Sequence, residues 1–125
     1  MLPLDEIETA LLRLDDALTR ETARDPETLL DDLDFVKGWG PRVAEMIADA
    51  EYHLNIKRGQ VALKYEHVNA LMRRELLAAE TAPEQRVFKL AERVNAALVH
   101  HQEATTSQLS YEKQQAAMNQ GRTQS

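Results

Sequence analysis

Proline is scarce in this chain, and its placement constrains the fold more than any other feature. The four prolines stand at positions 3, 26, 41 and 83. Because proline is tolerated in the first turn of a helix and is disruptive in its interior, each is expected near a helix start. Seventeen alanines and seventeen leucines dominate the apolar residues, which favours helix over sheet. We therefore predict an all-α protein.

Residues 1–37 are predicted to form an acidic N-terminal segment of short helices. Apolar residues recur every three or four positions, as on one face of an amphipathic helix: Leu4, Ile7, Leu11, Leu14 and Leu18. A second short helix is expected to start at Pro26 with Asp25 as its cap. It should end at the break of residues 38–41, Gly38-Trp39-Gly40-Pro41, because two glycines and a proline continue a helix only at high cost.

Residues 42–118 are predicted to form a long antiparallel helical hairpin, with the short N-terminal helices packed on its base. Its first helix should run to about Ala79, with Gly59 as a weak point. Thr81 and Glu84 have the spacing of a capping box, so the turn is placed near Thr81. On this reading, Thr81→Ala should lower stability by about 1 kcal/mol through loss of the cap. The second stripe runs from Val87 to Leu109 and becomes polar toward its end, and residues 119–125 are predicted to be a disordered tail.

Charge is distributed unevenly. Residues 1–36 hold eleven acids against three bases, a balance of −8, and residues 37–125 hold twelve bases against ten acids, a balance of +2. The acids could form an ordinary solvated helix face, dock on a basic partner, or cover the hairpin's own basic surface. Within the acidic segment, Asp31, Asp32 and Asp34 are candidates for partner binding, together with the single tryptophan, Trp39. Trp39 could equally plug a gap between the N-terminal helices and the hairpin base.

Basic residues gather in two groups that could follow a phosphate backbone. Antiparallel folding about Thr81 would bring Arg73 and Arg74 beside the bases that follow the turn. The candidate nucleic-acid-binding residues are Lys57, Arg58, Lys64, Arg73, Arg74, Arg86, Lys89 and Arg93. Interleaved glutamates could instead pair with these bases locally.

No enzyme signature is present. The chain has no cysteine and no phosphate-binding loop or HExxH motif, so no catalytic residues are proposed. His100 and Glu103 have metal-ligand spacing, but no second pair of this kind accompanies them, and we expect neither a metal nor another cofactor. No apolar run reaches the roughly 20 residues of a membrane span, which predicts no membrane contact and a cytoplasmic location.

Three segments carry a resemblance to known proteins: Glu51-Tyr52-His53-Leu54-Asn55, Ala62-Leu63-Lys64-Tyr65 and Thr81-Ala82-Pro83-Glu84-Gln85-Arg86. About residues 39–112 have the layout of a long helix, a short turn and a second long helix. With this layout, the three segments resemble small helical phage proteins from replication and recombination gene clusters. The layout is similar to that of UvsY-like recombination mediators. This resemblance implies an oligomer that binds single-stranded DNA and helps to load a recombinase against a single-strand binding protein, in a bacterial host cell.

Two functions follow from these observations. The first is a non-enzymatic DNA recombination or replication accessory that acts as a homo-oligomer. The second is a protein-binding inhibitor or adaptor of the phage counter-defence type, whose acidic face meets a basic host protein. If the first is right, deletion of residues 1–36 should strengthen DNA binding by removing eight net negative charges.

Overall fold

The computed structural model describes residues 1–19 and 26–123, with the side chains of 26–29, 32 and 121–123 left out of the description. It contains α1 (Leu4–Leu18), α2 (Pro26–Lys64), α3 (Ala70–Glu80) and α4 (Ala82–Thr123). Within these ranges there is no strand, which confirms the all-α prediction. The Asp25 cap lies outside the described residues.

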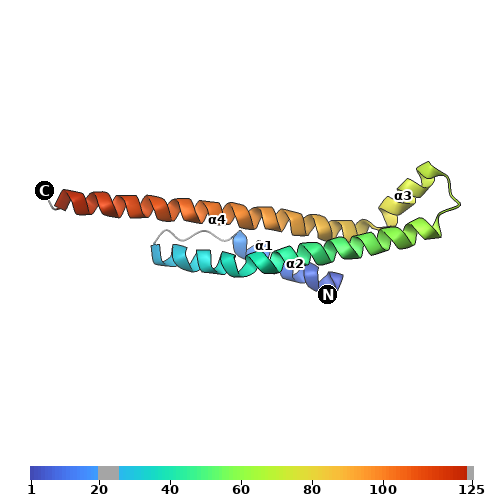
Figure 1. Ribbon diagram of the computed structural model, residues 1–125, viewed down its shortest axis with the longest axis horizontal. Helices are drawn as coiled ribbons and strands as arrows, with labels where there is room; N and C mark the ends of the chain where they lie inside the picture. Colours follow the sequence, from blue (N-terminus) through green and yellow to red (C-terminus); the bar gives the residue numbers. More distant parts are fainter. Residues whose placement is uncertain (20–25, 124–125) are drawn as a thin grey trace.

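The molecule is elongated, because its two longest helices lie side by side and antiparallel along most of α2 (Figure 1). Helix α1 packs on both of them near the middle of the molecule. Helix α3 lies at one end of the pair, and at the other end the last turns of α4 extend beyond the start of α2 (Figure 1).

The core lies where α1, α2 and α4 meet. The stripe predicted for residues 4–18 is correct, since its three central members are buried and Leu4 and Leu18 pack at the edges. The buried cluster as a whole comprises Ile7, Leu11, Leu14, Val36, Val43, Met46, Ala50, Val87, Ala91, Val94 and Leu98. Since the apolar residues of α1, α2 and α4 recur at helical spacing, each of these three helices buries one face and leaves the rest in water.

The predicted break at residues 38–41 is wrong, because α2 runs through it without interruption. Gly38 and Gly40 do not adopt positive φ. Glycine costs about 1 kcal/mol and proline about 3 kcal/mol inside a helix. Val36, Val43 and Met46 are buried on either side of the segment, and each contributes about 1.5 to 3 kcal/mol. The free energy gained by burying these side chains therefore offsets the cost of having Gly38, Gly40 and Pro41 inside the helix.

The first long helix does not run to Ala79 as predicted. It continues through Gly59 and stops at Lys64, and a loop of residues 65–69 leads into α3. Asn69 starts α3 as an N-cap, accepting a hydrogen bond from the Met72 amide at 2.9 Å. The turn of the chain is therefore at residues 65–69, and the hairpin tip predicted near Thr81 is wrong.

Thr81 is a buried joint between α3 and α4 instead of a capping box. Its hydroxyl donates to the Leu77 carbonyl at 2.7 Å and accepts from the Gln85 side-chain amide at 2.8 Å. Backbone bonds from Thr81 to Leu77 and from Gln85 to Thr81 continue the helical pattern across the joint. A hydroxyl that bonds back to a carbonyl four residues earlier is not directed at the Glu84 amide, so the predicted cap does not form.

The predicted boundaries change accordingly. One short N-terminal helix is present in place of two, since the second is the first part of α2. The tail predicted for residues 119–125 is helical as far as Thr123, and residues 124–125 lie outside the description. A lack of apolar residues removes packing from a helix, but it leaves the backbone hydrogen bonds in place.

Candidate nucleic-acid interface

A short basic face lies on the first half of α4. Lys89 and Arg93 follow Arg86 by three and seven residues, so all three project from the same side of the helix. With Ala82, Gln85 and Leu90 they line an open surface groove. The three basic residues span about 10.5 Å of the helix axis.

Two carboxylates of α1 border this basic face. Arg86 donates to Glu8 at 3.1 Å, and Arg93 donates to Asp15 at 3.3 Å. Both pairs advance by seven residues in the same direction, which shows that α1 and α4 run parallel. Within the described residues, Lys89 lies between the two pairs and forms no ion pair of its own.

The ion pairs do not remove the arginines from solvent. The Arg86 side chain remains 70% exposed and the Arg93 side chain 62% exposed. Exposed ion pairs contribute about 0 to 1 kcal/mol, because water and salt screen them. Each guanidinium keeps further N–H donors that another anion could use.

A second basic site lies between the end of α2 and the end of α3. Lys64 donates to Glu80 at 3.1 Å, and the Tyr65 hydroxyl donates to the same carboxylate oxygen at 2.7 Å. The pKa of Glu80 is below its usual value. The hydrogen bond from Tyr65 is the largest cause, and the hydrogen bond from Lys64 is the next largest. The hydrogen bond to Glu80 raises the pKa of Lys64. Lys57 lines the groove beside them, but the carboxylate already neutralises part of this charge.

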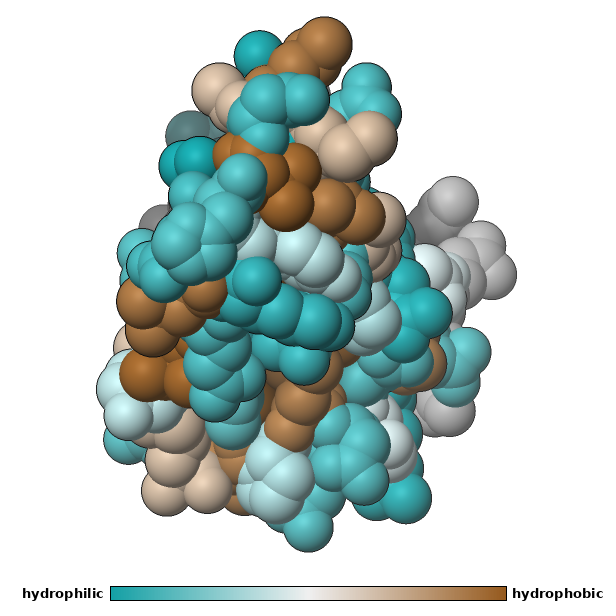
Figure 2. Space-filling model, turned by 90° about the vertical axis from the view of Figure 1, so that its right-hand side faces the viewer, coloured by the Kyte–Doolittle hydropathy of each residue, from teal (hydrophilic) through white to brown (hydrophobic). Residues whose placement is uncertain are grey.

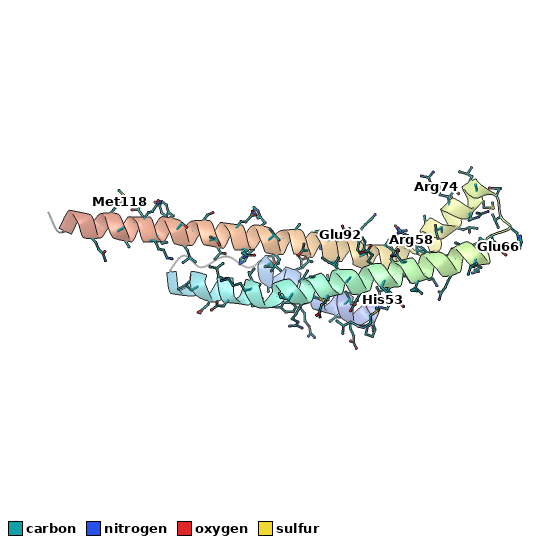
Figure 3. The ribbon with its side chains drawn as sticks, in the orientation of Figure 1. His53, Arg58, Glu66, Arg74, Glu92 and Met118 are labelled. Atoms are coloured by element: carbon teal, nitrogen blue, oxygen red, sulfur yellow. The ribbon has the colours of Figure 1, made fainter. Side chains whose placement is uncertain are left out.

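Arg58 belongs to neither of these sites. It lines a groove between α2 and α4 together with Lys89, and also with Glu51 and Glu92. Figure 3 places Arg58 and Glu92 on the two neighbouring helices. Two acids therefore balance two bases in this groove, which makes it a weaker anion site than the basic face of α4.

Arg73 and Arg74 are not brought beside the basic face of α4 by antiparallel folding, so that prediction is wrong. They lie on α3, which precedes the Thr81 joint, and Figure 3 shows Arg74 at the α3 end of the molecule. The Arg73 guanidinium donates to the carbonyls of Tyr65, Glu66 and Val68 at 3.2, 3.0 and 2.8 Å. Arg73 thus holds the loop, while Arg74 is exposed.

Trp39 is half-buried and packs against the core. The Phe35 ring lies 6.3 Å from it, and the Arg42 guanidinium stands 4.2 Å from its ring centre. Trp39 therefore packs against the core, and its role in partner binding stays a prediction. Asp31 and Asp34 are exposed on the same helix, and the side chain of Asp32 lies outside the description.

Among the described residues, no three histidine, aspartate or glutamate side chains converge as a metal ion would require. None of the four helices, over the part that the structure describes, has the combination of length and apolar character needed to cross a bilayer.

Comparison of the chain with family models, with curated proteins and with solved structures finds no match.

The sequence analysis allowed the acidic segment to cover the basic surface of the hairpin, but it did not single out Glu8 and Asp15 as the residues that do so. A signal was present, because Glu8 and Asp15 have the same seven-residue spacing as Arg86 and Arg93. Equal spacing on two helices allows two ion pairs only if the helices are parallel and in register. That condition depends on the packing of α1 and is not contained in either segment alone.

Proposed function

We propose that the protein is a non-enzymatic DNA recombination or replication accessory of the phage mediator type. In this role it binds single-stranded DNA through the basic face of α4 and acts as a homo-oligomer with a recombinase or single-strand binding protein as partner. The observation that supports DNA binding most is the row formed by Arg86, Lys89 and Arg93, in which Lys89 has no ion pair among the described residues and both arginines remain exposed. Such a row offers three cations to consecutive phosphates.

The α1 carboxylates reduce the positive potential of this face and so set a modest affinity. Deletion of residues 1–36 does not test this cleanly, because it removes Ile7, Leu11, Leu14 and Val36 from the core. The cleaner change is Glu8→Gln with Asp15→Asn, which keeps the shape of both side chains and removes two charges. We expect this double variant to bind a labelled oligonucleotide more tightly than the wild type.

The experiment measures fluorescence anisotropy of a short single-stranded oligonucleotide at two salt concentrations. Arg86→Ala with Arg93→Ala should weaken binding and lower the salt slope by about 0.7 for each phosphate that is no longer neutralised. Asp31→Asn with Asp34→Asn is the charge-matched control for the α1 variant, and it should change affinity far less. DNA binding at this face would be contradicted if the wild type does not bind the oligonucleotide. It would also be contradicted if the arginine substitutions leave the affinity and the salt slope unchanged.

The protein-binding alternative is favoured by one observation. Asp31, Asp34 and Phe35 are exposed together on the first part of α2, so an acidic surface with an aromatic ring is available to a basic partner. If the oligonucleotide does not bind and Asp31→Asn with Asp34→Asn abolishes capture of a basic protein, the alternative function gains support.

A further inference from the structure

The groove between α2 and α4 that contains Arg58 is built from two helix segments with the same spacing. On each helix the lining residues follow the first one by three, four and seven positions: Glu51, Leu54, Asn55 and Arg58 on α2, and Gln85, Phe88, Lys89 and Glu92 on α4. Each segment is therefore about 10.5 Å long and presents one side of its helix to the groove. The volume of the groove, about 170 Å³, is smaller than that of a site for a drug-sized ligand.

The groove has an acidic end and a basic end. Because α2 and α4 run antiparallel, the two segments meet in opposite order (Figure 1). Glu51 therefore lies at the same end as Glu92, and Arg58 lies at the same end as Gln85. Within the described residues, neither carboxylate at the acidic end forms an ion pair. The acidic end thus offers free hydrogen-bond acceptors to a ligand.

The middle of the groove supplies apolar surface with side-chain amides beside it. Leu54 is buried, and Phe88 is partly buried and packs against the core. The Gln85 amide nitrogen donates to the buried Thr81 hydroxyl at 2.8 Å, which fixes the orientation of this side chain. The Asn55 side chain has no hydrogen bond to any residue that the structure describes. An aromatic ring flanked by hydrogen-bonding groups is typical of a surface that contacts a flat heterocycle.

The groove is continuous with the basic face of α4. Gln85 and Lys89 line both of them. Arg86 and Arg93 are paired with α1, whereas the groove lies on the side of α4 that meets α2. A strand whose phosphates lie along the basic face therefore has this groove within reach of its bases.

We infer that the groove binds one nucleobase of the strand and favours a base that carries an exocyclic amino group. The inference rests on the proposed function and names the chemistry that the site selects. The base packs on Phe88 and Leu54. Its amino group donates to Glu51 and Glu92, since carboxylates accept hydrogen bonds from the amino group of cytosine. Lys89 binds the neighbouring phosphate.

The charges of the groove determine both the orientation of the nucleotide and the kind of base. The acidic end repels a phosphate, so the phosphate lies toward Lys89 and Arg58. Thymine has a carbonyl oxygen at the position where cytosine has its amino group. That oxygen would face the two carboxylates without a hydrogen between them, so the groove favours cytosine over thymine.

The first test compares two labelled homopolymers of equal length, oligo-dC and oligo-dT, by fluorescence anisotropy. The wild type should bind oligo-dC about tenfold more tightly, because matched contacts to a base edge discriminate by this order. Equal affinity for the two, with binding that still depends on Arg86 and Arg93, would overturn the base site and leave the proposed function standing. Absence of binding to either homopolymer would overturn both.

The second test removes the acidic end. Glu51→Gln with Glu92→Gln should bring the two affinities to about the same value, because the preference comes from these carboxylates. Glu45→Gln with Glu103→Gln is the charge-matched control, since both are exposed glutamates on the same two helices outside the groove. This control should preserve the ratio of the two affinities. A preference for oligo-dC that survives the loss of Glu51 and Glu92 would overturn the proposal.

The third test removes the aromatic ring. Phe88→Leu keeps an apolar side chain at the core and should weaken the binding of oligo-dC about fivefold. The salt slope should not change, because no phosphate contact is lost. Phe35→Leu, an exposed phenylalanine on α2, is the matched control and should leave binding unchanged. Circular dichroism checks that both variants keep their helix content. Unchanged oligo-dC affinity of a folded Phe88→Leu variant would overturn the placement of the base in this groove.

Discussion

Two buried threonines in this protein have opposite hydrogen-bonding states. The Thr81 hydroxyl has both a donor and an acceptor partner, while the buried Thr105 hydroxyl has no partner among the described residues. A buried polar group without a hydrogen bond costs about 1 to 3 kcal/mol. The two sites therefore respond in opposite directions to the loss of the same atom.

We predict that Thr105→Val raises the free energy of unfolding by about 1 kcal/mol, because valine keeps the shape and removes the unpaired hydroxyl. Thr81→Val should lower it by about 1 to 2 kcal/mol, since Gln85 loses its acceptor and the joint loses its bond to Leu77. Chemical denaturation of both variants beside the wild type measures these changes. A destabilised Thr105→Val would show that its hydroxyl is bonded in solution.

At the scale of the element, α3 is held in place mostly by polar contacts. None of its residues is buried, and Leu71 and Met72 are exposed. The end of the molecule that carries α3 shows hydrophobic patches among hydrophilic ones (Figure 2). Its position depends on the Asn69 cap, on Arg73 and on the group formed by Lys64, Tyr65 and Glu80.

We predict that Arg73→Ala frees the 65–69 loop, because one guanidinium donates to three loop carbonyls. The substitution should lower the free energy of local opening of α3 by about 2 kcal/mol. Hydrogen exchange of residues 65–80 measures it directly. Arg74→Ala is the matched control, and equal exchange in the two variants would contradict a role for Arg73 in holding the loop.

The contact between α2 and α3 should depend on pH. The pKa of Glu80 in the folded protein is below its usual value of 4.5, so its stabilisation is complete above that value and is lost as pH falls through the lowered pKa. The pKa of Lys64 is raised above 10.5, so its contribution is complete below 10.5 and is lost as pH rises through the raised pKa. Glu80→Gln should remove the acid-side change in exchange of α3, and Glu75→Gln should not. Equal acid profiles for the wild type and Glu80→Gln would rule out this linkage.

On the scale of the whole molecule, the features predicted correctly from the sequence are the buried faces of the helices, because apolar residues recur there at helical spacing. The buried residues Val87, Ala91, Val94 and Leu98 lie on the stripe predicted from Val87 to Leu109, and the buried residues of α1 lie on the stripe predicted for residues 4–18. The features that were missed depend on packing between distant segments. The cost of Gly38, Gly40 and Pro41 is local, but the burial that offsets it comes from α1 and α4. From the sequence, the Thr81 hydroxyl could either cap a helix or donate to a carbonyl four residues earlier. In the structure Thr81 is buried at the joint and donates to the Leu77 carbonyl.

The candidate site shows the same division. The three bases on one face of α4 follow from their spacing, whereas their two carboxylate neighbours depend on the parallel placement of α1. The placement of Arg73 and Arg74 was wrong because the turn was assigned to Thr81 and the Asn69 cap was overlooked. A single asparagine before an apolar helix is a common N-cap. Here the apolar stripe continues on both sides of Asn69, so the sequence favoured one uninterrupted helix over a new helix start.

The single helix α4 connects the basic face to the end that extends beyond α2, where Figure 3 shows Met118. At 1.5 Å per residue, Arg86 and Met118 are separated by about 48 Å along one axis. A helix fixes direction as well as distance, so ligands bound at the two ends would also be fixed in angle. Inserting seven residues between them would lengthen the spacing by about 10.5 Å and nearly preserve that angle, whereas inserting two would turn one end by about 200°. The single helix α4 thus sets both the spacing and the relative angle of its two ends.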